Sequence, residues 1–229
     1  MQKTISVIIT AYNYAQYIEE CVESVLNQSV MPDEIFVVDD GSTDNTAELV
    51  KKYPEVKYVW QENAGLSAAR NTGIGLAKSE YIMCLDADDM LKKDAIKEHM
   101  KIAEPDAIAQ CGLMYFGTQN AIYRPLGATY ESLIKSNTVY CNSVFPKAYW
   151  KKVAGFDESE TMRLGLEDWE FWIRMTKAGL KVNTSDYIAL LYRRHGSTMT
   201  HTTTHPNWNK ITSYMIKKNK IKAEMKRLD

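Results

Sequence analysis

Strand-like and helix-like segments alternate along the first 110 residues of the chain. Short apolar runs predict four strands, at residues 5–9, 34–38, 57–60 and 80–85. The segments between them carry turn residues and helical periodicity, as in residues 18–26, where apolar side chains recur at intervals of three and four. Strands separated by helices in this way are typical of a parallel sheet with helices on both faces. We therefore predict an α/β fold.

Polar side chains follow three of these strands. The three clusters are Tyr12-Asn13, Asp39-Asp40 and Asp86-Ala87-Asp88-Asp89. The carboxyl ends of parallel strands lie along one edge of the sheet, and α/β proteins bind their ligands outside that edge. We therefore expect the three clusters to converge there.

The acidic cluster of residues 86–89 points to a metal ion at that edge. Carboxylates packed so closely repel each other by about 1 kcal/mol per pair in water, and a divalent cation would relieve the repulsion. Mg²⁺ and Mn²⁺ are hard ions that prefer such oxygen ligands. On these four residues alone, a polar loop in which Asp88 or Asp89 caps the next helix is an equal alternative.

Charge is distributed unevenly between the two halves of the sequence. Residues 1–110 contain 10 Lys and Arg against 19 Asp and Glu, a net charge of −9, whereas residues 111–229 contain 18 against 10, a net charge of +8. If the first half binds a phosphate ligand, backbone amides and a metal must therefore supply most of the neutralisation. The second half could attract an anionic partner.

The overall composition, with 45% hydrophobic and 25% charged residues, is that of a globular protein. The sequence has no run of 18 apolar residues and no secretory signal pattern at its start, so we expect a cytoplasmic protein without a transmembrane helix. Its four cysteines are scattered and form no C-x-x-C pair. Such spacing is typical of reduced thiols and argues against a zinc site.

The second half is less regular than the first. We predict helices at residues 146–153 and 167–178 and a strand at residues 188–192. Glu167 and Asp168 open the second of these helices. An acid in the first turn often does no more than favour the helix dipole, but that location also keeps a carboxylate ionised, as a general base requires. Both interpretations of Asp168 stay open at this point.

Six segments of the sequence together resemble one known enzyme family. They read SVIITAYNYAQYIEECVESVLNQ, EIFVVDDGSTDNT, NAGLSAARNTGIGLAKSEYI, LDADD, GFDES and LEDWEFWIRM. In this order and spacing the chain resembles the family-2 glycosyltransferases of the GT-A fold over nearly its whole length. The resemblance implies a mostly parallel, Rossmann-like sheet flanked by helices. It also implies an inverting transferase that uses a nucleotide sugar, usually UDP-linked, with Mn²⁺ or Mg²⁺.

The resemblance implies which residues bind the nucleotide sugar. Thr10, Ala11 and Tyr12 would form the wall against which the nucleobase packs, and Asp40 would meet a base N–H. Asn63 would belong to the same site. Arg70, in the A-R-N segment, would lie near the diphosphate.

The resemblance also implies which residues bind the metal and carry the chemistry. Asp86 and Asp88 match the family's D-x-D pair, which serves the ribose and the metal. Asp168 matches the catalytic base, and Glu167 is the neighbour that would orient the acceptor or the base. His195 matches a late histidine that reaches the metal in some members.

The implied reaction is the transfer of one sugar to a glycan or lipid-linked acceptor. The sequence lacks the Q-x-x-R-W segment of the family's processive synthases, which favours a single addition. A sugar-nucleotide pyrophosphorylase is an alternative, but it should carry a glycine-rich and basic loop after the first strand, and residues 10–17 have neither feature. A non-catalytic nucleotide-sugar-binding module is a second alternative, and the intact Asp88 and Asp168 speak against it. We expect no nucleic-acid partner.

We expect one domain in two halves, followed by a tail. Residues 1–110 would bind the nucleotide sugar, residues 111–205 would bind the acceptor, and residues 206–229 would form a basic helical tail. The tail carries Trp208, Ile211 and Met215 at helical spacing, followed by a run of lysines and Arg227. Charge runs of this kind usually face water. The sharper hypothesis is a peripheral contact with the inner face of the membrane, near lipid-linked acceptors.

Overall fold

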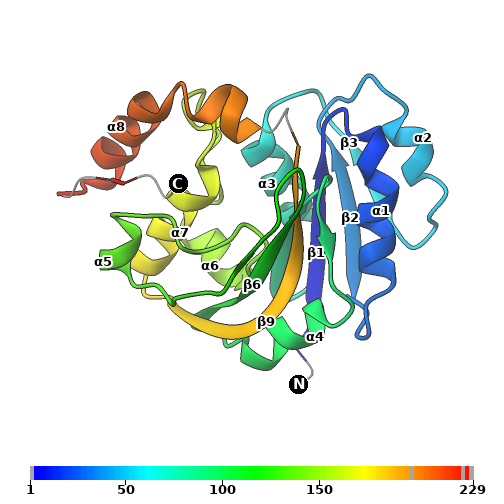
Figure 1. The fold of residues 1–229 in the computed structure, drawn as a ribbon, viewed down its shortest axis with the longest axis horizontal. Coiled ribbons are helices and arrows are strands. Elements are labelled where there is room, and N and C mark those ends of the chain that lie inside the picture. The colour runs from blue at the N-terminus through cyan, green and yellow to red at the C-terminus, as the bar shows by residue number, and fades with distance from the viewer. Residues whose placement is uncertain (1–2, 196–198, 223–224, 227–229) are drawn as a thin grey trace.

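A parallel sheet forms the first layer of the protein (Figure 1). The computed structural model describes residues 3–195, 199–222 and 225–226. The sheet has the strand order β3-β2-β1-β4-β8, in which β8 alone runs antiparallel to its neighbour. Its strands are β1 (Ile5–Ala11), β2 (Glu34–Asp39), β3 (Lys57–Trp60), β4 (Tyr81–Asp86) and β8 (Phe145–Pro146). The first four confirm the strands predicted from the apolar runs.

Helices cover both faces of this sheet, which is why β1 and most of β2 and β4 are buried. The helices of the first half are α1 (Ala15–Leu26), α2 (Thr46–Val50), α3 (Leu66–Leu76) and α4 (Ala95–Ile102). The predicted apolar face of α1 is confirmed, because Ile18, Cys21, Val22 and Val25 are all buried. On the other face, α3 approaches β1 so closely that a Cβ on Gly73 would overlap Ile8.

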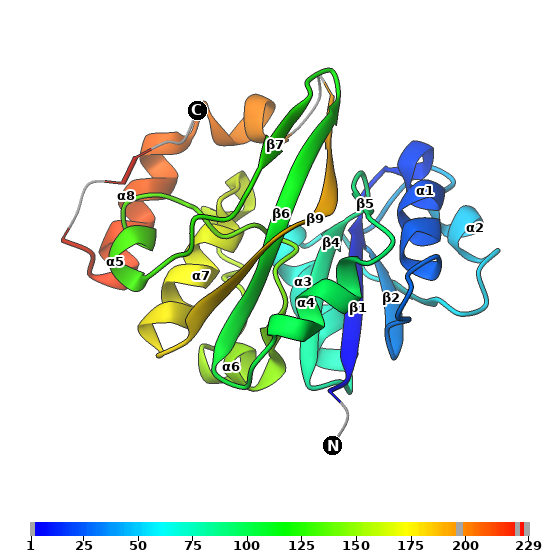
Figure 2. The ribbon, with the colours of Figure 1, turned by 60° about the horizontal axis from the view of Figure 1, so that its bottom comes forward.

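A second sheet crosses the molecule between the first sheet and the helices of the second half (Figure 2). Its strand order is β5-β9-β6-β7, and its strands are β5 (Met90–Leu91), β9 (Lys181–Arg194), β6 (Ala107–Gly117) and β7 (Ala121–Tyr123). The sequence predicted only residues 188–192 of this sheet. Polar and small residues such as Gln110 and Gly112 interrupt the apolar pattern of β6, and the β6–β9 register shifts on both sides of Gly112. The boundary expected near residue 110, between the nucleotide-sugar-binding half and the acceptor-binding half, lies within β6.

The second half also contributes helices on the side of the sheet opposite α1. They are α5 (Tyr130–Leu133), α6 (Lys147–Lys152), the 3-10 turn η1 (Met162–Leu164), α7 (Glu167–Lys177), the π-turn η2 (Thr200–Thr204) and α8 (Trp208–Asn219). Helix α7 is the centre of this layer, with Trp169, Phe171, Trp172 and Ile173 almost fully buried. None of the helices in the described ranges is both long and apolar enough to cross a membrane.

The tail helix is shorter than predicted. Helix α8 ends at Asn219 rather than near residue 228, because Lys220 adopts a left-handed conformation with φ 55°. A left-handed residue at this position commonly ends a helix. Arg227, the last basic residue of the predicted tail, lies outside the described residues.

Candidate functional site

The polar clusters after β1, β2 and β4 meet at one edge of the first sheet, as the sequence predicted. Strand register pairs Thr10 with Asp86 and Ala11 with Asp39. The Thr10 hydroxyl donates a long hydrogen bond of 3.4 Å to Oδ1 of Asp86, and Ala11 is buried. Tyr12 is 49% exposed. A planar ligand could therefore pack against Tyr12 just beyond the end of β1.

Asp40 holds the loop of residues 61–65 in the described structure. Its Oδ1 accepts from Gln61 Nε2 at 2.7 Å and from the amide of Ala64 at 2.9 Å, while Oδ2 accepts from the amide of Gly65 at 2.8 Å. The side chain of Asn63 donates to the Asp40 carbonyl at 3.0 Å and accepts from Arg163 at 2.7 Å. Asp40 is only 4% exposed, so its contact with a nucleobase stays a prediction, as does that of Asn63.

Arg70 joins the two halves of the site. It is 1% exposed, and its two terminal nitrogens lie 2.8 Å from Asp86 Oδ1 and 2.7 Å from Glu167 Oε1. Arg70 comes from α3, Asp86 ends β4 and Glu167 begins α7. A buried guanidinium needs such partners, because an unpaired buried charge is strongly destabilising. Arg70 thus positions two carboxylates, and its expected contact with a diphosphate stays a prediction.

The three aspartates after β4 have different surroundings. Asp88 Oδ2 lies 3.0 Å from His195 Nε2. Burial raises the pKa of Asp88, repulsion from Asp86 raises it further, and the hydrogen bond with His195 opposes both. Asp89 is buried, and its Oδ1 accepts from the amide of Arg193 at 2.8 Å. Within the described chain its Oδ2 has no partner. Asp89 does not cap a helix, because α4 begins only at Ala95.

These acids fit a divalent cation that a nucleotide would help to bind. In the described residues no three His, Cys, Asp or Glu side chains form a ready-made metal site. Asp88 and His195 nevertheless lie side by side, and the charges of Asp86, Asp88 and Asp89 act on one another, so the three carboxylates are close together. Mg²⁺ is usually held by one or two carboxylates together with substrate phosphates and water, so a partial set of protein ligands suffices.

Asp168 is the second residue of α7, two positions after Leu166, whose backbone is left-handed with φ 62°. It is half-buried, and it accepts hydrogen bonds from the Trp169 amide at 2.7 Å and from Asn137 Nδ2 at 3.2 Å. Burial raises the pKa of Asp168 to about 7; the neighbouring Glu167 acts in the same direction and Arg70 in the opposite one. A carboxyl group with this pKa can accept a proton near neutral pH.

Two neighbours of the site had no signal in the sequence. Asn137 contacts Asp168, and the Cys141 thiol lies 3.8 Å from Asp86 Oδ2. Both belong to the irregular segment between α5 and β8, which matches no motif. Only the three-dimensional structure brings them to the carboxylates.

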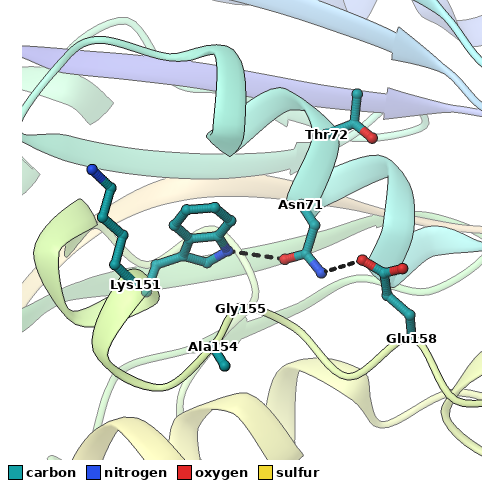
Figure 3. A pocket seen from close by; sticks show the side chains of 7 residues that line it. Asn71, Thr72, Lys151, Ala154, Gly155 and Glu158 are labelled. Carbon is teal, nitrogen blue, oxygen red and sulfur yellow. Dashed lines mark hydrogen bonds between the residues drawn. The ribbon is translucent and has the colours of Figure 1, made fainter.

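Asn71, which follows Arg70, has a structural role at an open hollow (Figure 3). Its Oδ1 accepts from the Trp150 indole at 2.9 Å and from the Phe156 amide at 2.8 Å, and its Nδ2 donates to Glu158 at 2.7 Å. These bonds tie α3 to residues 155–158, the G-F-D-E part of a segment singled out in the sequence. Adjacent residues of one helix therefore serve the site and the packing around it.

Two family models match the chain. The model described as "Glycosyl transferase family 2" matches residues 6–157, and the one described as "N-terminal domain of galactosyltransferase" matches residues 130–202. "Glycosyltransferase GlyA" of Streptococcus pneumoniae is 35% identical over 153 residues, covering 63% of this chain and 21% of that protein. "Chondroitin synthase" of Pasteurella multocida is 31% identical over 190 residues, covering 76% of this chain and 19% of that protein. The chain thus spans about a fifth of the length of these two relatives.

Solved structures share the fold of the chain. S. aureus TarS 1–349 in complex with UDP-GlcNAc gives a TM-score of 0.78 at 21% identity, covering 97% of this chain and 68% of that one. Mannosyltransferase PcManGT from Pyrobaculum calidifontis, in complex with GDP-Man and Mn²⁺, gives 0.65 at 22% identity, covering 84% and 57%. At these identities the likeness shows the fold alone, and it confirms the predicted GT-A architecture.

Proposed function

The chain belongs to glycosyl transferase family 2, and from this premise we propose that it transfers one sugar from a nucleotide sugar to a glycan or lipid-linked acceptor, with inversion. The observation that carries the proposal is the buried Arg70, which pairs with Asp86 on the donor side and with Glu167 beside Asp168. A UDP-linked donor is favoured because TarS, which shares the fold, is described in complex with UDP-GlcNAc.

In the proposed reaction Asp168 is the general base. An inverting transfer needs a carboxylate that removes the proton from the acceptor hydroxyl as it attacks the sugar carbon. The hydrogen bonds from the Trp169 amide and Asn137 orient the Asp168 carboxylate. The ion pair with Arg70 holds the side chain of Glu167 in place next to Asp168. The acceptor hydroxyl would therefore meet a base whose position is set in advance, which lowers the entropic part of the barrier.

We propose Mn²⁺ or Mg²⁺ as the cofactor. Asp88 and His195 would hold it, together with Asp86, and it would neutralise the leaving diphosphate as a Lewis acid. The charge of the first half supports this assignment, because a region with a net charge of −9 would otherwise repel a nucleotide.

A thermal-shift titration tests the donor site. We expect UDP and UDP-sugars to raise the melting temperature of the protein when Mn²⁺ is present, and to do so much less when the metal is removed with EDTA, because a ligand that binds only the folded state stabilises it. Asp88→Asn should weaken the shift, whereas Asp186→Asn, an exposed acid on β9, should not. A shift of equal size with and without metal would contradict the metal assignment.

The structure separates the lysines of the tail into two groups. Helix α8 packs through Ile211 and Met215, both fully buried, and Lys218 Nζ lies 2.6 Å from Asp157 and 2.9 Å from Glu170. Lys218 therefore holds the helix in place. We propose that the exposed lysines around it, rather than Lys218, make a peripheral contact with an anionic membrane.

A liposome co-sedimentation assay tests this contact. Neutralising three exposed lysines with glutamine should weaken binding to phosphatidylserine vesicles by about a hundredfold, because each is worth about 1 kcal/mol near an anionic surface. The three residues are Lys217, Lys220 and Lys222. The matched control removes the same charge from other exposed lysines: Lys51, Lys78 and Lys93. Equal binding by both variants would refute a contact specific to the tail.

A further inference from the structure

Three tyrosines from three strands of the second sheet form a cluster, here called the tyrosine platform. They are Tyr115 on β6, Tyr123 on β7 and Tyr192 on β9. The ring centroids of Tyr115 and Tyr123 lie 4.7 Å apart, and those of Tyr115 and Tyr192 lie 5.3 Å apart. The Arg194 guanidinium packs over the Tyr115 ring at 5.1 Å, and Tyr123 is 41% exposed. Aromatic surface is thus gathered in one place and left partly open to solvent.

Strand register places the tyrosine platform on the same face of the second sheet as two buried core leucines. Tyr115 is paired with Tyr192, and Leu113, two residues earlier on β6, is paired with both Leu190 and Tyr123. Side chains two residues apart on a strand point to the same face. Leu113 and Leu190 are buried in the core, so the platform extends that apolar face beyond the part that the first sheet covers.

The platform borders the carboxylates of the proposed active site. Tyr192 immediately precedes Arg193, whose amide donates to Asp89 at 2.8 Å. Burial raises the pKa of Tyr192, and Asp89 and then Cys141 raise it further. The thiol of Cys141 lies 3.8 Å from Asp86. Within residues 3–195, 199–222 and 225–226, none of the three phenol oxygens makes a hydrogen bond. These hydroxyl groups are therefore available to a ligand.

We propose that the tyrosine platform binds a pyranose ring of the acceptor, stacked on its C–H face; this inference rests on the proposed transferase function. Tyrosine combines an aromatic face with a polar end, and a sugar ring likewise combines an apolar C–H face with hydroxyl groups. Binding sites for small ligands are mostly apolar and aromatic with a few placed polar groups, as here. In the proposed function the nucleotide occupies the ends of β1 and β2. A sugar ring bound on the platform would therefore reach the active-site carboxylates from the side of the second sheet.

Saturation-transfer NMR tests the platform without knowledge of the natural acceptor. The probes are the methyl glycopyranosides of glucose, galactose, N-acetylglucosamine and N-acetylgalactosamine, added to the full chain with UDP and the diamagnetic Mg²⁺. We expect at least one probe to receive saturation at its ring C–H protons. Tyr123→Ala should weaken its affinity by about tenfold, as expected for the loss of a stacking partner. Tyr123→Phe should retain most of it. Ile122→Ala, an exposed neighbour that points to the opposite face of β7, should have no effect.

Two results would overturn the platform. One is unchanged glycoside affinity in Tyr123→Ala, and the other is the failure of all four probes to bind the unaltered protein. Release of UDP from UDP-sugars, measured on the unaltered protein in parallel samples that hold a UDP-sugar and the same glycosides but no added UDP, distinguishes the failure of this inference from the failure of the proposed transferase function. Ring binding without any nucleotide release would refute the transferase and keep the platform as a carbohydrate site, whereas nucleotide release with unaffected Tyr123→Ala would refute the platform alone.

Discussion

The Asp168→Asn protein is expected to lose turnover by about 10²–10⁴-fold while it still binds the nucleotide sugar, because an amide cannot accept the proton of the acceptor hydroxyl. The substitution keeps the size of the side chain, and its one oxygen can keep the bond from the Trp169 amide, whereas the bond from Asn137 to the second oxygen is lost. Unchanged turnover would refute Asp168 as the base. Loss of turnover together with loss of nucleotide binding would point to misfolding instead.

The pH dependence of the unaltered enzyme provides a second measure of the same residue. Burial, followed by repulsion from Glu167, raises the pKa of Asp168 to about 7. The base is active only when ionised, so kcat/KM should rise as pH increases through about 7 and then level off. Asp186→Asn, the exposed control on β9, should keep this profile. A rate that stays constant from pH 5 to pH 8 would contradict the assignment.

Stability distinguishes a catalytic Asp168 from one that only favours the helix dipole. A folded pKa of about 7, above the ordinary 3.8, means that ionised Asp168 carries a cost in the free energy of folding at pH 8. This cost is absent below pH 4 and develops between pH 4 and pH 7. Asp168→Asn should therefore be more stable than the unaltered protein at pH 8, and about equally stable at pH 4. A carboxylate that stabilised the start of α7 would give the opposite sign at pH 8.

The sequence predicted the parts of the site that depend on local pattern. The buried strands β1, β2 and β4 read as apolar runs, and their parallel pairing brings Tyr12, Asp40 and Asp86 to one edge without further information. The second sheet was largely missed, because β6 and β9 gain their stability from pairing across more than 70 residues rather than from a regular apolar alternation. The tyrosine platform was missed for the same reason.

Contacts between distant residues also changed the interpretation of individual side chains. Arg70 matched a segment expected near a diphosphate, but its partner Glu167 is 97 residues away, and nothing in the sequence links the two. Asp40 matched a base-binding residue, and the structure shows it holding the loop of residues 61–65. A motif identifies which residues gather at a site, whereas burial and pairing decide which of them have free atoms.

Arg70→Met is expected to lower the free energy of unfolding by about 3–5 kcal/mol, because it leaves Glu167 and Asp86 without their buried partner. Chemical denaturation measures this loss. Arg70→Lys should recover part of it, since the charge is retained, but a single ammonium cannot replace the fork that spans two carboxylates. Activity should fall in both variants. A variant at position 70 that is as stable as the unaltered protein would show that the two ion pairs contribute nothing.

A double substitution separates the positioning role of Arg70 from its part in folding. In Arg70→Met with Glu167→Gln one of the two unpaired charges is gone while Asp86 remains, so stability should recover in part relative to Arg70→Met alone. The measured quantity is the acid limb of the pH profile, which is the pH at which kcat/KM rises. A residue with a purely structural role would not change this pH. Arg70 lowers the pKa of Asp168, so its removal should move the limb to higher pH, whereas removal of the Glu167 charge, which raises that pKa, should move it back. If kcat/KM rises at the same pH in both variants as in the unaltered enzyme, Arg70 and Glu167 do not act on Asp168. That result would refute a role for Arg70 in connecting the donor site to the base.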